Sequence, residues 1–539
     1  MPLFVHEQAG TMMNLRERVE RLVKYCGQYQ AHGFMIDERN QDASFDICMP
    51  EEKEIRENIK DLKIILLTGE AGDGKSRLLR NVKSTLTEHG FAEPCSDFSA
   101  LSEEDKAALI KRMRAVMDGK SEEKLFILAN IGVFTQAVLQ NDMEMMEQLT
   151  ASRQDVFVCN FENRNLAEHA ETFQEIVNAF LTYEDRQGCE GCRWAGRCAY
   201  QENIDAILAE QGTDAIRAIC NAIYLTGGHV TFRELLSMLA YMVSFGESCA
   251  ERQQKWDGAL SMDEEDWDKI LYYNVFEKNG DLLLDKISCM DPAKKRGEEN
   301  RESLSRMNGK RAYIRWRRKN FFQYEGDKYQ LLNVDYLVEF YKTLEYMNQP
   351  PYNYDMAKDK NPVLQELKRG IKKMANRGKD DTGLVVTDTP LIFDNQIRTE
   401  FMVMQDMSMI WHRYDMQIGK KTEKPERIWN KFYLSYLWKG ENSGDRKLIS
   451  LLIDYKQFRY LMMCSKDYFM NRNELSVEEY AVNTFYRKIL QESKQAYDAI
   501  VIRFDENVDG VCDFSLMVHT SEDIFAEEQS TTIRIKRED

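Results

Sequence analysis

Proline is scarce in this chain, at 9 of 539 residues, and no Pro-rich linker, internal repeat or low-complexity tract interrupts it. No run of about 18 apolar residues occurs, so the sequence offers no membrane-spanning helix of ordinary length. Residues 1–10 lack the charged and apolar segments of a signal peptide. We therefore expect a cytoplasmic protein that has no membrane partner.

Positive charge is also in deficit, because 73 Lys and Arg residues stand against 90 Asp and Glu residues, a net charge of −17. Such a surface as a whole repels nucleic acid, so contact with DNA requires a local basic patch or a partner protein. The most basic stretch, residues 311–322, interleaves Arg and Lys with Tyr and Trp, which suits a phosphate backbone and stacked bases. Internal salt bridges are the alternative role for the same residues.

The most specific pattern present is the segment 69–76, which has the spacing G-x-x-x-x-G-K-[ST]. An apolar run precedes it and a helical pattern follows, and this context predicts a phosphate-binding loop. Glycines let the backbone wrap around a polyphosphate beside the positive end of a helix. Lys75 is expected to reach the β- and γ-phosphates and Ser76 to coordinate Mg²⁺, so ATP and Mg²⁺ are the expected cofactors. The residues expected at the nucleotide are Gly69, Glu70, Ala71, Gly72, Asp73, Gly74, Lys75, Ser76 and Arg77.

Apolar runs alternate with helical patterns around this loop, which is the rhythm of a parallel sheet. The expected strands are residues 63–68, a short piece near 94–98, 124–129 and 155–160, and the expected helices include 102–117 and 134–150. The predicted fold class is an α/β P-loop NTPase core of the AAA/STAND type. Its parallel strands are expected to be buried on both faces.

A hydrolytic site of this kind needs an acid at the end of a neighbouring strand, yet the run 125–129 is followed by Asn130. One interpretation places the acid at Asp97, near another strand end; the alternative role for Asp97 is to cap the following helix. The other interpretation is weak hydrolysis, with the nucleotide acting as a switch. We favour hydrolysis that is slow or depends on a partner.

Two further residues are candidates for the catalytic site. Asn160 ends the run 155–160 and is expected to orient the attacking water, with an Asx turn as its alternative role. Arg233 lies in the first turn of a helix, where its charge is unfavourable to the helix dipole, so we expect it to face a ligand phosphate as a lid arginine. Thr231 and Glu234 have the spacing of a capping box at the start of that helix. Arg164, after Asn160, is either an arginine finger for a neighbouring subunit or an ordinary arginine.

Three cysteines form a compact motif, Cys189-x₂-Cys192-x₅-Cys198, in a glycine-containing segment between two helical patterns. Paired thiols at this spacing suit a structural Zn²⁺ or an iron–sulfur cluster, with unligated thiols as the alternative. The candidates for a fourth ligand are Cys220, which we rank first, Cys159 and His229. The other cysteines are mostly scattered, which fits a reducing compartment.

The expected domain organisation is a series of five parts. Residues 1–60 form an N-terminal helical segment, 61–170 the P-loop NTPase core and 171–250 a helical lid with the cysteine cluster. Residues 251–345 form a helical, winged-helix-like domain and 346–539 a C-terminal α+β domain. The C-terminal half is expected to be mostly helical and to end in a small β element at 498–504 and 532–535.

Several fragments together resemble the DptF-type ATPases of phosphorothioation-dependent DNA restriction systems. They are residues 69–76, the segment 129–134 and the stretch 272–276 that leads to Asp291 and Pro292. The resemblance extends from about residue 55 to about residue 335. It implies a bacterial defence ATPase that acts with partner proteins against DNA lacking a protective backbone modification. It also implies that the segment around Asn130 belongs to the nucleotide site.

The leading functional hypothesis is therefore an ATP-binding and hydrolysing subunit of a bacterial anti-phage DNA restriction complex. Nucleotide would control assembly of a homo-oligomer or the activity of a partner effector, with DNA bound directly or through partners. The alternative is a nucleotide-switched scaffold with little or no hydrolysis, which Asn130 favours.

Overall fold

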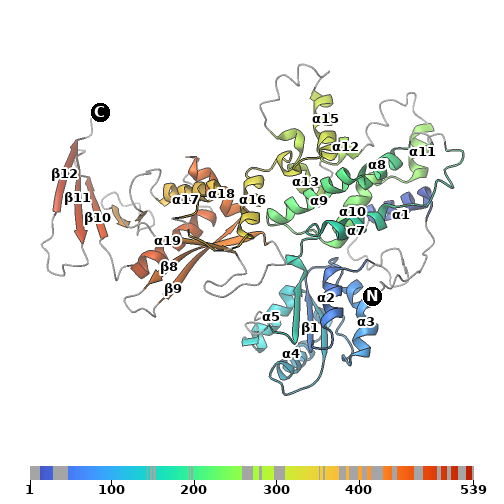
Figure 1. The fold of residues 1–539 in the computed structure, drawn as a ribbon, viewed down its shortest axis with the longest axis horizontal. Helices are drawn as coiled ribbons and strands as arrows, with labels where there is room; N and C mark the ends of the chain where they lie inside the picture. The colour runs from blue at the N-terminus through green and yellow to red at the C-terminus, as the bar shows by residue number, and fades with distance from the viewer. Residues whose placement is uncertain are drawn as a thin grey trace. The chain divides into compact units, whose positions relative to one another are not determined.

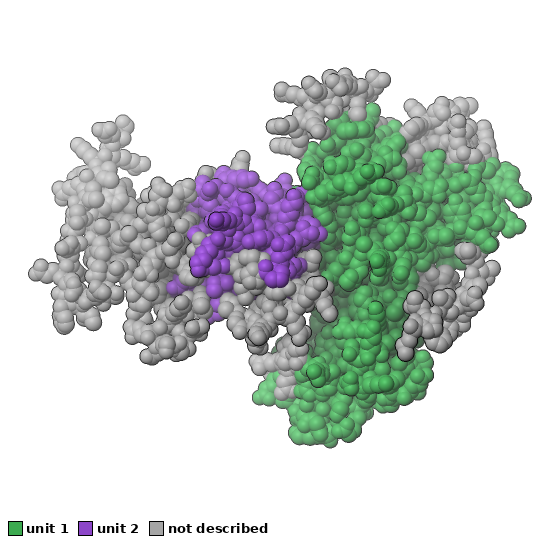
Figure 2. Space-filling model, viewed as in Figure 1, with its two compact units in different colours: residues 1–224, 228–334 green, residues 225–227, 335–539 purple. Residues whose placement is uncertain are grey.

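The computed structural model describes most of the N-terminal 350 residues and separate segments of the remainder. The described residues are 13–27, 47–142, 144–145, 149, 153–192, 195, 198–257, 271–277, 282–295, 310–350, 353–355, 358–375, 384–387, 398–403, 409–413, 429–439, 446–466, 477–493, 499–506, 511–519 and 530–536. The chain forms two compact units, one of residues 1–224 with 228–334 and one of residues 225–227 with 335–539 (Figure 2). None of the described helices has the length and apolar character needed to cross a bilayer.

A three-stranded parallel sheet organises the N-terminal part of the first unit (Figure 1). Strand β1 (Ile64–Thr68) is central, between β2 (Leu125–Ala129) and β3 (Val156–Asn160). All five residues of β1 and of β2 are buried, as expected for covered parallel strands. The prediction is wrong for β3, where no residue is fully buried and Val158 is 41% exposed.

Helices cover both faces of this sheet. Alternate side chains of β1 point to opposite faces, so both faces present apolar residues that pack against helices. On one face, Ile65 and Leu67 pack with α2 (Pro50–Asn58) and α3 (Lys75–Glu88). On the other face, Ile64 and Leu66 pack with α4 (Glu103–Met117) and α5 (Ile131–Asn141). The predicted α/β class is confirmed to the extent that a parallel sheet is covered by helices on both faces.

The strand expected near residues 94–98 does not form. Cys95 makes a single parallel bridge to Ile127, and the chain then turns into the 3₁₀ helix η2 (Phe98–Ala100). Asp97 caps η2 by accepting the Ser99 N–H at 2.9 Å. It does not cap α4, because Ser102 accepts the Asp105 N–H there.

A helical region follows the sheet in the first unit (Figure 1). It contains α7 (Ala170–Leu181), α8 (Ala199–Leu208), α9 (Glu210–Leu225), α10 (Phe232–Ser244) and α11 (Cys249–Asp257). The N-terminal helix α1 (Leu15–Gly27) packs against α10. Helices α8, α9 and α10 fall within residues 171–250, and the assignment of that range as a lid stays a prediction.

The rest of the first unit holds α12 (Leu271–Asn274), α13 (Leu282–Cys289) and α15 (Lys310–Gln323). The basic stretch lies in α15, and two of its arginines are engaged within the chain. Arg318 forms a buried ion pair with Asp291 and a second ion pair with the exposed Glu277, at 2.7 Å each, and Arg317 donates to the carbonyl of Pro292. The internal salt bridge is therefore confirmed for Arg318, whereas Arg317 is held by a hydrogen bond to the backbone. The described part of residues 251–345 contains no strand that would serve as a wing.

The second unit is richer in strands than predicted. Its helices are α16 (Leu337–Met347), α17 (Pro362–Ala375), α18 (Tyr455–Ser465) and α19 (Val477–Ser493). An antiparallel sheet has the order β4 (Asn353–Asp355), β7 (Met409–Arg413), β8 (Lys431–Lys439), β9 (Arg446–Asp454). A second sheet has the order β12 (Ser530–Lys536), β11 (Val511–His519), β10 (Ala499–Glu506), β6 (Arg398–Val403), β5 (Leu384–Thr387).

The expected strands near 498–504 and 532–535 correspond to β10 and β12, but they join a five-stranded sheet rather than a small terminal element. The prediction of a mostly helical half is thus wrong for this unit. In β8, alternate residues such as Phe432 and Leu434 are buried. Aromatic side chains on a half-buried surface favour a strand.

Candidate functional site

The turn between β1 and α3 contains three glycines in a backbone conformation that residues with a side chain rarely adopt. Gly69, Gly72 and Gly74 have φ values of 144°, 100° and 91°. A Cβ on Gly69 would lie 2.5 Å from Asp73 Oδ2 and 2.9 Å from Phe161 Cβ. A Cβ on Gly72 would lie 3.0 Å from Arg233 Cβ. The glycines therefore permit both a positive φ and the close approach of other chain segments.

This turn leads directly into the N-terminus of α3. Gly74 is the N-cap residue, and no side chain caps the helix. The first backbone N–H groups of a helix have no partner within the helix and carry its positive partial charge. An anion placed at this end would be stabilised by both.

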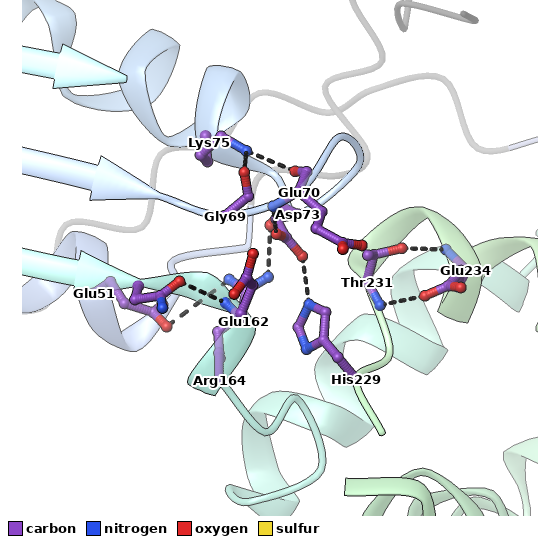
Figure 3. Close-up of polar contacts among 11 residues, drawn as sticks. Glu51, Gly69, Glu70, Asp73, Lys75, Glu162, Arg164, His229, Thr231 and Glu234 are labelled. Carbon is purple, nitrogen blue, oxygen red and sulfur yellow. Dashed lines mark hydrogen bonds and ion pairs between the residues drawn. The ribbon is translucent and has the colours of Figure 1, made fainter. Parts of the chain in front are cut away.

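Lys75 folds back over the turn. Its Nζ donates to the carbonyl of Gly69 at 2.9 Å and to that of Glu70 at 2.6 Å (Figure 3). Burial lowers the pKa of Lys75, and the nearby carboxylates of Asp73 and Glu162 oppose that shift. Ser76 is exposed next to it. The ammonium and the hydroxyl thus lie at the helix end where an anion would bind.

Arg77 lies in the first turn of α3, but its side chain is directed elsewhere. Its Nη2 donates to the carbonyl of Ile47 at 2.7 Å, and its guanidinium lies over the ring of Phe232, 5.4 Å from the centroid. Only its backbone belongs to the helix N-terminus.

Asp73 links the turn to the rest of the first unit. Its side chain is fully buried, and its Oδ2 accepts the Glu70 N–H at 2.6 Å. Its Oδ1 lies 2.7 Å from His229 Nε2, and its backbone carbonyl accepts from Arg164 Nη2 at 2.6 Å (Figure 3). A short side chain thereby fixes the shape of the turn and connects it to residues far away in the sequence.

The start of α10 packs on the same turn. The predicted capping box is present: Thr231 N–H donates to Glu234 Oε2 at 2.7 Å, and Glu234 N–H donates to Thr231 Oγ1 at 3.1 Å. The Arg233 N–H donates to the carbonyl of Gly72 at 3.1 Å. The structure therefore brings the backbone of Arg233 to the turn, and the expected contact of its side chain with a ligand phosphate stays a prediction.

Two asparagines flank the turn at the carboxyl ends of the outer strands. Asn160 is in register with Thr68, and its Oδ1 accepts the Glu162 N–H at 3.1 Å. Asn130 is exposed and caps α5, accepting the N–H groups of Gly132 and Val133. The Asx turn weighed for Asn160 is confirmed, while the amide nitrogens of both residues remain at the strand ends next to the turn.

Glu162 is a candidate that the sequence reasoning did not select. It lies in the 3₁₀ helix η3 (Phe161–Asn163) directly after β3. Burial raises the pKa of its carboxyl group, as do the neighbouring charges of Glu70 and Asp73. Its negative charge also raises the pKa of Lys75, more strongly than the more distant Asp97 does. In the sequence, Glu162 is an acid two residues after the end of the strand, whereas the expected position of the acid was directly at the strand end.

Arg164 is not positioned to serve as an arginine finger for a neighbouring subunit. Its side chain is 10% exposed, lies 4.4 Å from the centroid of the Phe161 ring and contacts Glu51 at 3.8 Å. With its hydrogen bond to Asp73, it supports the turn from within the same chain.

The cysteine motif lies in a different part of the first unit. Cys189, Cys192 and Cys198 line one cavity of about 40 Å³ together with Cys249, which the sequence reasoning did not consider. The preferred fourth ligand, Cys220, is buried in α9 near Glu234 and does not line this cavity. His229 contacts Asp73, and Cys159 belongs to β3. Among described residues, no three His, Cys, Asp or Glu side chains are arranged to share one metal ion.

Comparison with known proteins adds no relative: no protein-family model, curated protein or solved structure matches this chain.

Proposed function

We propose that this chain binds and hydrolyses ATP, with Mg²⁺, at the turn formed by residues 69–76. The observation that carries the proposal is the conjunction of a glycine turn, an uncapped helix N-terminus and the Lys75 ammonium at one place. These are groups that bind a polyphosphate: the backbone N–H donors and positive end of a helix start, together with a compact cation.

The surrounding residues supply the other roles that phosphoryl transfer requires. Ser76 is the Mg²⁺ ligand, and Lys75 neutralises charge on the β- and γ-phosphates. Arg233 senses the γ-phosphate from the start of α10, which already contacts Gly72. Asn160 orients the attacking water through its amide.

Glu162 is the group that accepts a proton from that water. Its carboxylate belongs to the strand end beside the turn, and its raised pKa makes it a better base than an ordinary glutamate. Asp97 is exposed and follows the bridge between Cys95 and Ile127 of β2, and its charge also raises the pKa of Lys75, less than those of Asp73 and Glu162 do. An acid at position 130 is therefore not required.

We further propose that this ATPase is a subunit of a bacterial DNA-defence complex, forms a homo-oligomer and acts with partner proteins. Support comes from the resemblance of residues 69–76, 129–134 and 272–276 to DptF-type ATPases. The net charge of −17 and the internal ion pairs of Arg318 favour DNA contact through partners over contact through α15.

The second candidate function is a nucleotide-switched scaffold, which the exposed Asn130 at the end of β2 favours. Steady-state phosphate release, with and without DNA, separates the two candidates. If the chain is an ATPase, the unmodified chain should release phosphate faster than the Lys75→Ala variant. If it is a scaffold, the two rates should be equal while the unmodified chain still binds ATP. Lys83→Ala is the matched control, because Lys83 lies on the same helix and is 61% exposed.

A further inference from the structure

Strand β9 (Arg446–Asp454) lies at the edge of the four-stranded antiparallel sheet in the second unit (Figure 1). In the part of the chain that is described, its one strand neighbour is β8, and all nine residues of β9 pair with that strand. An edge strand presents a row of backbone N–H and C=O groups that can pair with a further strand. The outer edge of β9 is therefore a place where another strand can be added.

The centre of β9 lacks the features that usually protect an edge. Soluble proteins place proline, lysine or a bulge in such a strand, or cover the edge. Residues 448–453 contain neither proline nor a charged residue, and the pairing with β8 continues without a bulge from Arg446 to Asp454. Helix α19 contacts β8 as well as β9, as a helix over a face of the sheet does, whereas a helix beyond the edge would reach β9 alone. An unprotected edge of this length is expected to pair.

One face of β9 is apolar and exposed. The buried residues of the strand are Ile449, Leu451 and Ile453. Between them, on the opposite face, Leu448 and Leu452 are 40% and 39% exposed. Ser450 lies on the same exposed face between the two leucines. A strand added at this edge would bring its own side chains next to these leucines.

The sequence of β9 is complementary to itself about Ser450. When two copies of β9 pair antiparallel with Ser450 at the centre, Leu448 of one copy lies opposite Leu452 of the other. The same register places Arg446 opposite Asp454, so residues of opposite charge meet at both ends of the pair. The two-fold symmetry of such a pair produces each of these contacts twice.

Neighbouring registers lose this complementarity. A register centred on the residue after Ser450 would set Leu448 against Asp454. One centred on the residue before Ser450 would set Leu452 against Arg446. Both place an apolar residue opposite a charged one, which the register centred on Ser450 avoids. The residues of the strand thus specify one register.

We infer that two copies of this chain associate through their β9 strands, paired antiparallel about Ser450, so that their four-stranded sheets join into one continuous sheet. The inference specifies an interface for the homo-oligomer proposed above. It does not rest on the nucleotide site, which belongs to the other compact unit. A second copy is the occupant because the strand is complementary to itself in both apolar residues and charge.

The mass of the full-length chain in solution is the first test. Sedimentation or light scattering over a range of concentrations should show a species of twice 63.2 kDa, without nucleotide as well as with Mg²⁺-ATP. Lys75→Ala should form the same dimer, so a dimer that binds no ATP would remove the nucleotide site alone. A chain that stays monomeric at every concentration would overturn the inference.

Two double variants test the register with the same two exposed positions. Leu448→Lys combined with Leu452→Lys sets like charges opposite each other, whereas Leu448→Lys combined with Leu452→Glu sets opposite charges against each other. The dissociation constant of the Lys/Lys variant should exceed that of the Lys/Glu variant by at least about tenfold. Equal constants would contradict the register, and a Lys/Lys dimer as tight as that of the unmodified chain would contradict the interface.

Ser450→Cys reports the pairing directly, whether or not the double variants dimerise. In the inferred register residue 450 lies opposite its own copy, with Cα atoms about 4.5–5.5 Å apart, within the range of a disulfide. Leu448→Cys is the matched control, because its own copy lies four residues further along the pair, more than about 13 Å away.

Mild oxidation should link the Ser450→Cys chains through residue 450 and leave Leu448→Cys unlinked at residue 448. Mass spectrometry of the linked peptide identifies the bond, since the chain has 12 cysteines of its own. No bond at residue 450, or equal linkage in the two variants, would overturn the inference.

Discussion

His229 and Asp73, which are 156 positions apart in the sequence, lie with the imidazole Nε2 and the carboxylate Oδ1 2.7 Å apart. The histidine precedes α10, and the aspartate lies in the turn before α3. A hydrogen bond also joins these two segments, because the Arg233 N–H donates to the Gly72 carbonyl. The conformation of the turn is therefore coupled to the helical region, so a ligand bound at the turn would bias that region.

A double-mutant cycle measures this coupling. Asp73→Ala and His229→Ala should each destabilise the chain, and the pair should deviate from additivity by about 0.5–3 kcal/mol in denaturant unfolding. His89 is the matched control, because its Nδ1 contacts the Thr85 carbonyl of its own helix. The combination Asp73→Ala with His89→Ala should be additive within about 0.5 kcal/mol. If both double mutants showed the same deviation from additivity, the contact between Asp73 and His229 would contribute no interaction energy.

The Glu162→Gln variant tests the proposed base. It should lower ATP turnover by about 10²–10⁴-fold while leaving ATP affinity within a few fold, since the amide cannot accept the proton of the attacking water. Asp97→Asn is the comparison variant and should have the smaller effect. The opposite order would assign the role to Asp97.

The pH dependence of turnover follows from the same carboxyl group. Burial and the charges of Glu70 and Asp73 raise the pKa of Glu162. A base must be ionised, so turnover should fall as pH decreases through this raised pKa, above the ordinary value of about 4.3. A profile with its acidic limb at or below that value would exclude Glu162 as the base.

Two glycines of the turn should respond differently to alanine. Gly69→Ala places a Cβ 2.5 Å from Asp73 Oδ2 in addition to a positive φ, whereas Gly74→Ala has a φ of 91° but no heavy atom within 4 Å. Gly74→Ala should cost about 1–2 kcal/mol of strain, and Gly69→Ala clearly more. Thermal unfolding gives the order, and a larger loss for Gly74→Ala would mean that the turn has another shape.

Arg318 should be structural. Arg318→Met leaves the carboxylate of Asp291, which is 2% exposed, without its charge partner and should destabilise the first unit by about 3–5 kcal/mol. Lys319→Met, at an exposed position of the same helix, should change stability by less than about 0.5 kcal/mol. If Arg318→Met left the free energy of unfolding unchanged, Arg318 would not be structural and residues 311–322 would again be a candidate DNA-binding surface.

Local patterns made the turn at 69–76, the capping box of α10 and the strands β1–β3 predictable, because each is specified by neighbouring residues. Glu162 and Cys249 were missed for different reasons. The position of Glu162 depends on the 3₁₀ turn after β3, and Cys249 reaches its cavity only through the packing of α11, 51 positions after Cys198. The second unit was misjudged because its strands are held by partners distant in sequence, such as β6 with β10.

Equilibrium binding of Mg²⁺-ATP to the full-length chain, measured by titration calorimetry, is the most direct test of the nucleotide site. The account predicts saturable binding at about one site per chain, weakened by about 10–100-fold in Lys75→Ala because a charged hydrogen-bond donor is removed. Lys83→Ala should bind as the unmodified chain does. No binding to the unmodified chain, or equal affinity in Lys75→Ala, would contradict the account.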